Sequence, residues 1–220
     1  DPDCLGKALV YGAQLLEGSS AGVYRFTDGV ATSNSTVIAN PTIPTQDIFG
    51  NLVRDRLNSF NLDGSGYSSV ANNSSIKPTS ALSIECWVKT PDVGLASKYI
   101  SDADVGATRF FLMQVGSKAR FKIATTEIDS ATNLTNNSWH YIAGTWDGTT
   151  MTLYVDEDTP VTISKSGAIT YDTDDLFIGS RLGTGEYFDG LISDVRLYDR
   201  ALTSDEVENN YNAGLSAHTN

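Results

Sequence analysis

Basic residues are few in this chain, and they are scattered along it. The chain holds 15 lysines and arginines against 27 aspartates and glutamates, which gives a formal net charge of −12 over 220 residues. Nucleic acids and anionic membrane surfaces are bound through clustered positive charge, so we expect neither as a partner. No apolar run approaches the roughly 18 residues that span a bilayer, so we also expect no membrane insertion.

Soft metal ligands are equally scarce. Two cysteines and two histidines in the whole chain leave no cluster for zinc. Cys4 and Cys86 fit either one disulfide or two buried thiols, and the residues alone leave both readings open. A bridge between them would close a long loop and stabilise the fold by roughly 4 kcal/mol.

Alternation with a period of two dominates the rest of the sequence. Within residues 82–89, apolar side chains occupy every second position, which is typical of a half-buried strand. Similar runs lie at about 97–101, 108–115, 119–126, 139–146, 151–156, 161–164, 175–180 and 188–197. So many short strands predict an all-β sandwich or barrel. The residues expected to be buried are Ile84, Cys86, Val88, Leu153, Val155, Phe177, Val195 and Leu197.

One helix interrupts this pattern, at residues 203–213 near the C-terminus. Thr203 and Glu206 have the spacing of a capping box, and Gly214 is a stop signal, so we expect a short helix at the edge of the sandwich. No linker divides the chain, and we expect residues 1–220 to form one domain. Residues 1–55 are poor in large apolar groups and are expected to be a divergent N-terminal strand and loop embellishment; a small separate domain is the alternative.

Aromatic side chains fall into two groups. The tryptophans Trp87, Trp139 and Trp146 lie in strands and are expected to pack in the core. The tyrosines Tyr67, Tyr99 and Tyr187 lie in turn-rich segments, where an aromatic ring can stack on the apolar face of a sugar. We take these three as candidate ligand-binding residues, with packing at the rim as the alternative role.

The order of several blocks carries a family resemblance. "FNLDGSGYSSV" (60–70), "LSIECWVKT" (82–90), "SWHYIAGTWDGTTMTLYVD" (138–156), "LFIGS" (176–180) and "FDGLISDVRLYDRALTSDEV" (188–207) resemble the laminin-G-like, pentraxin-related concanavalin A-like domains. The resemblance covers about 60–220. It implies a jelly roll of two antiparallel sheets with a short helix after the last strand, and a binding role for carbohydrate, calcium or another protein.

The resemblance also implies a metal site. Relatives with a structural calcium ion use an acidic residue at the position of Asp194 and another near the first strand, which points to Asp28. Because Asp194 alternates with apolar residues, its carboxylate needs a partner, and calcium, a backbone N–H or an arginine would each serve. The paired calcium site of pentraxins is not expected, since this chain reads Ser180-Arg181-Leu182-Gly183 where they carry acidic residues and glutamine.

Catalysis is not expected. Glycosidases on this fold place two carboxylates across a cleft, and no strand here supplies such a pair. The run Asp156-Glu157-Asp158 is interpreted as a solvated turn, and residues 171–175 as a loop that could hold a cation. We expect a non-catalytic binding or adhesion domain, extracellular or displayed on a cell or virion surface, with a glycan or a surface protein as partner. The alternative is a structural or decoration protein that forms homo-oligomers or larger assemblies through residues 1–55.

Overall fold

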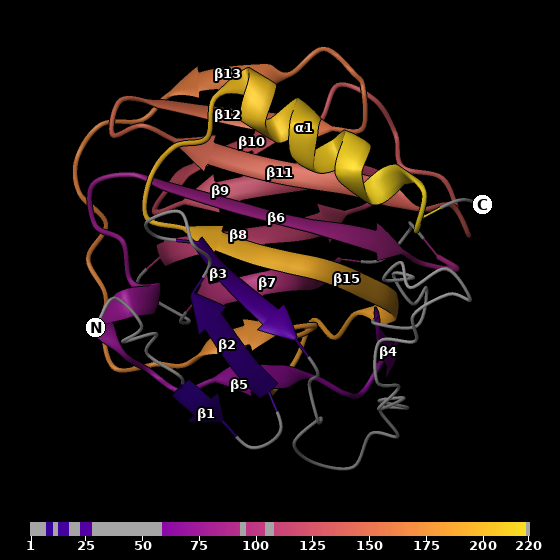
Figure 1. Cartoon of the computed structure of the whole chain (residues 1–220), viewed down its shortest axis with the longest axis horizontal. Helices are drawn as coiled ribbons and strands as arrows, with labels where there is room; N and C mark the ends of the chain where they lie inside the picture. Colours follow the sequence, from indigo (N-terminus) through magenta and orange to yellow (C-terminus); the bar gives the residue numbers. More distant parts are fainter. Residues whose placement is uncertain are drawn as a thin grey trace, which may run out of the picture.

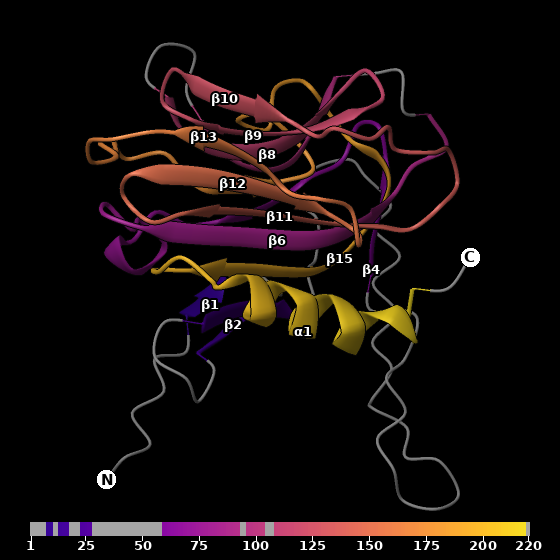
Figure 2. The ribbon, with the colours of Figure 1, turned by 90° about the horizontal axis from the view of Figure 1, so that it is seen from above.

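The chain folds into two antiparallel β-sheets packed face to face, with one α-helix on the outside (Figures 1 and 2). The structure is a computed structural model that describes residues 8–10, 13–17, 23–27, 59–92, 96–103 and 108–218. The first three ranges and positions 103 and 108 are described by their backbone alone. The predicted all-β sandwich with a short C-terminal helix is confirmed.

The larger sheet has nine strands. In order across the sheet these are β1 (Ala8–Val10), β2 (Ala13–Glu17), β3 (Val23–Thr27), β15 (Asp189–Tyr198), β6 (Leu82–Lys89), β11 (His140–Trp146), β12 (Thr150–Val155) and β13 (Val161–Ser164), with β4 (Ser59–Asp63) also paired to β15. The chain's last strand thus lies in the middle of this sheet, between β3 and β6.

The smaller sheet has six strands and covers the inner face of the first. Its order is β10 (Thr126–Asp129), β9 (Lys118–Ile123), β8 (Thr108–Val115), β7 (Ser97–Ala103), β14 (Leu176–Ile178) and β5 (Ser68–Val70). A single 3₁₀ turn, η1 (Ser74–Ile76), and one α-helix, α1 (Ser204–Leu215), are the helical elements of the described ranges.

The hairpin of β11 and β12 shows how the sequence sets the register. The carboxylate of Asp147 accepts hydrogen bonds from the backbone N–H groups of Thr149 and Thr150 at 2.8 and 2.7 Å, and Gly148 takes a φ of 95° that few other residues tolerate. The turn therefore places Trp146 opposite Met151. This register sends one set of β11 side chains into the sandwich and the other set outward.

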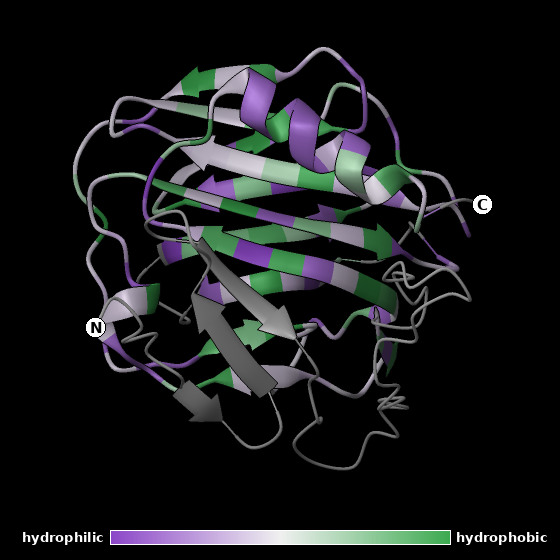
Figure 3. Ribbon diagram, viewed as in Figure 1, coloured by the Kyte–Doolittle hydropathy of each residue, from purple (hydrophilic) through white to green (hydrophobic). Residues whose placement is uncertain are grey.

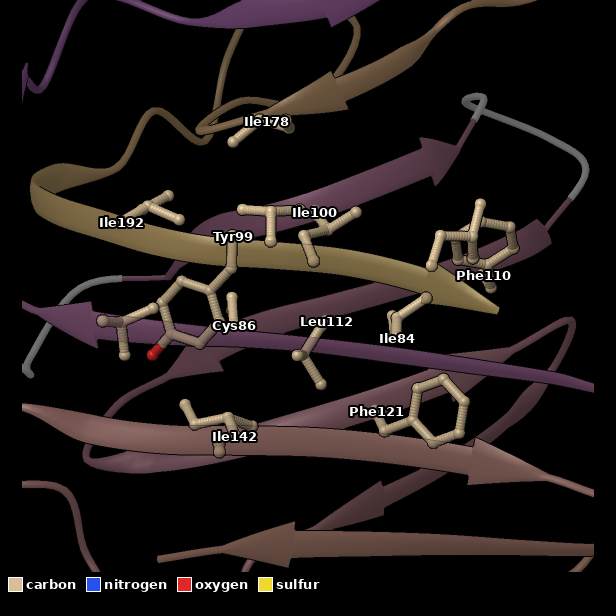
Figure 4. Close-up of a cluster of buried hydrophobic side chains, with 14 of the residues drawn as sticks. Ile84, Cys86, Tyr99, Ile100, Phe110, Leu112, Phe121, Ile142, Ile178 and Ile192 are labelled. Carbon is tan, nitrogen blue, oxygen red and sulfur yellow. The ribbon is translucent and has the colours of Figure 1, made fainter. Parts of the chain in front are cut away.

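The core between the sheets is built mainly from apolar side chains. Side chains such as Ile84, Phe110, Leu112 and Phe121 meet there from both sheets (Figure 4). Cys86 is among them, and the structure confirms its predicted burial. Its thiol is free, and burial raises its pKa; Cys4 lies outside the described residues.

The prediction of burial in the core is wrong for one residue, Phe177. Phe177 is only half-buried, because Leu176 and Ile178 on either side of it take the inward positions of β14. The alternation of a three-residue strand leaves Phe177 on the outer face of the smaller sheet.

The helix does not lie at the edge of the sandwich as predicted. It crosses the outer face of the larger sheet, over β6, β11 and β12 (Figures 1 and 2). A second apolar cluster fills this contact, and its buried members are Trp87, Tyr141, Ala143, Tyr198, Leu202 and Val207. The strands β6 and β15 alternate between polar and apolar residues (Figure 3), although the outward side chains of Ser83, Glu85 and Arg196 are buried.

A buried carboxylate fixes the helix to this face. Glu85 of β6 is fully buried and accepts hydrogen bonds from the hydroxyls of Tyr141 (2.6 Å) and Tyr198 (3.1 Å). Arg196 of β15 pairs with the same carboxylate. Asn210 of α1 donates its amide N–H to Glu85 at 3.1 Å. The network therefore joins three strands and the helix, and it stands under the helix where water is excluded.

Close packing between the sheets predicts a large cost for one small substitution. A Cβ atom at Gly144 would lie 2.6 Å from the ring of Phe121, whereas a Cβ at Gly185 would meet nothing within 4 Å. We expect Gly144→Ala to lower the free energy of unfolding by about 1–3 kcal/mol because the core must shift to admit the methyl group. Gly185→Ala is the matched control and should change it by less than about 0.5 kcal/mol. Urea denaturation of both variants checks this, and equal stabilities would contradict it.

Candidate functional site

Two of the three predicted tyrosines come together on the smaller sheet. The ring centroids of Tyr67 and Tyr187 lie 6.5 Å apart, and Tyr67 also packs against Phe177 at 5.8 Å. The hydroxyl of Tyr187 donates to the carbonyl of Gly183 at 2.6 Å. These rings thus hold the loop 180–187 in place while staying partly exposed. We call them the tyrosine pair.

The third predicted tyrosine is not at the surface. Tyr99 is 0% exposed, its ring packs edge-on against Phe188 at 5.3 Å, and its hydroxyl lies 3.3 Å from the side-chain oxygen of Gln114. The cause is an irregular register in β7 at this position, which turns Tyr99 into the core. The prediction of Tyr99 as a ligand-binding residue is therefore corrected, because no face of its ring can meet a sugar.

Charged side chains lie beside the tyrosine pair. Lys98 forms a 2.7 Å ion pair with Glu186, and Arg181 approaches the same carboxylate at 3.3 Å. Burial acts to raise the pKa of Glu186, but the hydrogen bond and charge of Lys98 outweigh burial and lower it. The charges of Lys98, Arg181 and Glu186 therefore pair with one another.

Asp194 of the predicted calcium site lies at an irregularity of β15, where the register shifts between Ser193 and Arg196. Its φ is 50°, which is rare for a residue with a side chain. Its carboxylate lies 3.5 Å from the Arg196 guanidinium and 4.0 Å from Nε2 of His218. Arginine, one of the three expected kinds of partner, is thus present. Asp28 lies outside the described residues.

The acidic loop 171–175 surrounds the protein's own cations. The ammonium of Lys77 donates to the carbonyl oxygens of Asp172 and Asp174 at 2.7 and 3.0 Å. The guanidinium of Arg109 pairs with the carboxylates of the same two residues. The described residues contain no group of three or more acidic, histidine or cysteine side chains arranged to hold a metal ion. Lys77 thus takes the carbonyl oxygens that a bound cation would use.

A concave feature lies on the other sheet, between α1 and the turn that follows β12. It is a groove of about 420 Å³, open to solvent. Its walls combine tyrosine rings with carboxylates, and its lining residues are Tyr154, Asp156, Glu157, Asp158, Pro160, Ser204, Val207, Glu208 and Tyr211. We call it the α1 groove.

One wall of the α1 groove is positioned by the packing of α1 against the larger sheet. The ring of Tyr211 stacks on Trp87 with centroids 5.5 Å apart and planes 13° apart. At the start of the helix, Thr203 and Glu206 form the predicted capping box, which fixes where the first turn begins. Glu208 and Tyr211 follow on the same side of the helix, three residues apart.

The opposite wall is positioned by β12 and its turn. Tyr154 stands on the outer face of the larger sheet, opposite Ala143. Asp156 has a φ of 50° and accepts a hydrogen bond from the backbone N–H of Tyr141 at 2.8 Å, while its other oxygen lies 2.7 Å from Nδ1 of His140. These contacts make Asp156 a fixed corner of the groove.

The electrostatics of the α1 groove are negative. Its lining includes four carboxylates, and no lysine, arginine or histidine. The pKa of Tyr211 is raised, first by burial and then by the charges of Glu157, Asp156 and Asp158. The carboxylates therefore act together on the tyrosine that forms the opposite wall.

Sequence reasoning missed this groove. It interpreted residues 156–158 as a solvated turn, and Glu157 and Asp158 are indeed exposed. The sequence does not reveal that α1 lies across the outer face of the larger sheet, and this position of the helix forms the second wall of the groove. One signal was present: Tyr154 falls on the outward side of a strand whose inward side is Met151, Leu153 and Val155, and an outward aromatic indicates a covered or ligand-binding face.

The comparisons with known proteins agree with this architecture. The family model described as "Concanavalin A-like lectin/glucanases superfamily" matches residues 62–208, and the chain belongs to this superfamily. Comparison with curated proteins gives no match.

Three solved structures illustrate the fold. The binding domain of botulinum neurotoxin DC in complex with SialylT is 14% identical, with a TM-score of 0.62 over 96% of this chain and 50% of that one. The Ruminococcus gnavus sialidase CBM40 bound to α2,3-sialyllactose is 16% identical, with a TM-score of 0.59 over 70% of this chain and 95% of that one. Domain 4 of the Geobacillus stearothermophilus arabinanase AbnA in complex with arabinotriose is 15% identical, with a TM-score of 0.55 over 69% and 75%.

These likenesses show the fold. The chain spans about half the length of the botulinum neurotoxin domain. Within the described part of the chain, no helix has the length and apolar character needed to cross a membrane.

Asp102 of β7, beside the Arg109 that pairs with the acidic loop, predicts that the stability of the fold depends on pH. Asp102 is fully buried, lies 3.6 Å from Arg109 and accepts no hydrogen bond from the described residues. Burial raises its pKa to about 7. A raised folded-state pKa means that the native state holds this proton more tightly than the unfolded chain does. The free energy of unfolding should therefore fall as pH rises from about 4 to about 7, by up to about 4 kcal/mol.

Asp102→Asn should remove this loss. The variant should match the parent below about pH 4 and exceed it in stability above about pH 7, since the amide stays neutral. Urea denaturation across this range checks the prediction, with Glu127→Gln, an exposed carboxylate on β10, as the control. Parallel pH profiles for parent and Asp102→Asn would contradict it.

Proposed function

We propose that this chain is a non-catalytic carbohydrate-binding domain of a secreted or surface-displayed protein, and that the sugar lies in the α1 groove. The observation that carries the proposal is the combination of two partly exposed tyrosines and four carboxylates around one open groove. The family and the solved relatives that hold sugars support it at the level of the fold.

The lining of the groove suits a polyhydroxylated ligand. The faces of Tyr154 and Tyr211 offer the flat apolar surface against which a sugar ring packs. The carboxylates of Glu157 and Glu208 accept hydrogen bonds from hydroxyl groups, and bonds to a charged acceptor are the stronger kind. Sugar-binding sites need this pairing of apolar faces with fixed polar groups.

The same groove is poorly suited to glycoside hydrolysis. A hydrolase needs one carboxyl group kept protonated by a buried environment, facing a second carboxylate across the bond. Glu157 and Glu208 are both exposed, and Asp156 is engaged by the backbone of Tyr141. These observations favour binding without catalysis.

The tyrosine pair on the smaller sheet is the second candidate surface. Its partly exposed rings at Tyr67 and Tyr187 lie beside Arg181 and Glu186, a polar pair that could contact hydroxyl groups. We rank it second because its polar groups already satisfy one another and the hydroxyl of Tyr187 is engaged by Gly183.

Substitutions on the two surfaces separate these candidates. A glycan array first identifies a ligand, and isothermal titration then compares Tyr154→Ala and Glu208→Ala with Tyr67→Ala and Tyr187→Ala. We expect the first two to weaken binding at least about tenfold, which is about 1.4 kcal/mol, and the second two to leave it unchanged. Melting curves identify any variant that fails to fold; Glu208 is exposed, so its variant should remain native.

The reverse pattern would move the site to the tyrosine pair. No binding to any glycan, together with a light-scattering mass well above that of one chain, would favour the alternative of an assembly protein.

We also propose that any bound metal is structural calcium near Asp194. The partly exposed carboxylate and left-handed backbone of Asp194 support this, while its contact with Arg196 weighs against it. If calcium binds, excess calcium should raise the melting midpoint relative to excess chelator, by binding the native state alone. Asp194→Ala should abolish that difference. Equal midpoints for the parent protein in the two buffers would remove calcium from the proposal.

A further inference from the structure

The charge of the α1 groove bears on which sugars it accepts. This inference rests on the proposed function and adds the chemical class of the ligand. Among the four carboxylates, Asp156 is engaged by Tyr141 and His140, and Asp158 by the hydroxyl of Thr132. Glu157 and Glu208 have no hydrogen bond or ion pair within the described part of the chain, and both are exposed at the groove.

Their positions place them on opposite sides of the opening. Glu157 belongs to the turn after β12, and Glu208 to the second turn of α1. No basic side chain lines the groove between them. An anionic sugar in the groove would lose its hydration and gain no cation in return, which is unfavourable. A cationic group between Glu157 and Glu208 would gain two carboxylate partners.

We propose that the α1 groove selects glycans that carry free amino groups, such as glucosamine units, over neutral glycans, and rejects sialylated ones. The tyrosine walls contribute to this selection as well. An ammonium group near Tyr154 or Tyr211 meets the negative face of an aromatic ring, and the four carboxylates of the lining place negative charge around these rings. The carboxylates and the faces of the tyrosine rings therefore both present negative potential to the ligand.

This selection differs from that of the solved relatives. The Ruminococcus gnavus CBM40 is bound to sialyllactose, a sugar that carries a carboxylate. A shared sandwich fold thus does not imply a shared ligand charge, because the groups that decide it lie on the turn and helix that border the groove.

The test compares three ligands by isothermal titration at about pH 6: a glucosamine tetrasaccharide, its fully N-acetylated counterpart and sialyllactose. At this pH amines are charged and exposed carboxylates are ionised. We expect the glucosamine oligomer to bind roughly tenfold more tightly than the acetylated one at low salt. The difference should shrink in 1 M salt, where the screening length is about 3 Å. Sialyllactose should not bind measurably.

Variants locate the effect. Glu157→Gln, Glu208→Gln and the double variant keep the shape of the groove and remove its unpaired charge, so they should lower stepwise the ratio of the affinity for the free amine to the affinity for the acetylated oligomer, because an amide still accepts hydrogen bonds from hydroxyl groups but does not attract an ammonium group. Glu127→Gln on β10 is the charge-matched control and should keep the full preference.

The outcomes are distinguishable. Equal affinity for the two oligomers, a preference retained in the double variant, or binding of sialyllactose that Tyr154→Ala abolishes would overturn the charge selection and leave the sugar-binding function standing. Failure of every glycan, on the array as well as here, would overturn both.

Discussion

The buried pair of Glu85 and Arg196 is the interaction on which the outer layer of this protein depends. Both side chains lie on central strands of the larger sheet, under α1. Removing either one would leave the other as an unpaired charge away from water, which typically costs 3–5 kcal/mol. Because Asn210 of the helix donates to Glu85, the pair also helps to specify where the helix sits, and a helix that sat elsewhere would lose this hydrogen bond.

Position of the helix decides whether the α1 groove exists. Trp87, Tyr141 and Tyr198 supply an apolar bed on the sheet, but such a bed alone tolerates several helix orientations. Directional hydrogen bonds to Glu85 restrict the choice, because the donors and acceptors must meet at about 3 Å. Just beyond the C-terminal end of the helix, the ring of His218 lies flat on Trp87 with centroids 4.3 Å apart, and its Nδ1 lies 2.8 Å from the carbonyl oxygen of Gly214. The helix is thus held along its length, and one wall of the groove with it.

The two halves of the molecule differ in how well the sequence predicted them. Strands and their inward faces followed from alternation and from the Asp147-Gly148 turn, because a period of two and a fixed turn leave one register. The outward positions of β6 did not follow. Ser83 and Glu85 read as solvent-facing polar residues, yet both are fully buried, since the segment 200–202 and α1 cover them. A polar residue on a strand has the same pattern whether water or a helix lies above it, so this part of the site required the tertiary structure.

The excess of acidic residues in the chain is related to where the fold places its basic side chains. Four of its basic side chains, Lys77, Lys98, Arg109 and Arg196, are engaged with acidic partners or loop carbonyls within the fold. The chain has 15 basic residues against 27 acidic ones, so each cation engaged inside the fold adds to the acidic excess of the surface. Arg196, for example, offsets the charge of the fully buried Glu85, which burial would otherwise penalise. Carboxylates on exposed turns and helices need no such partner, because water solvates them. Glu157 and Glu208 are exposed carboxylates of this kind. No basic side chain lines the groove beside them, so a cationic ligand can pair with their charges.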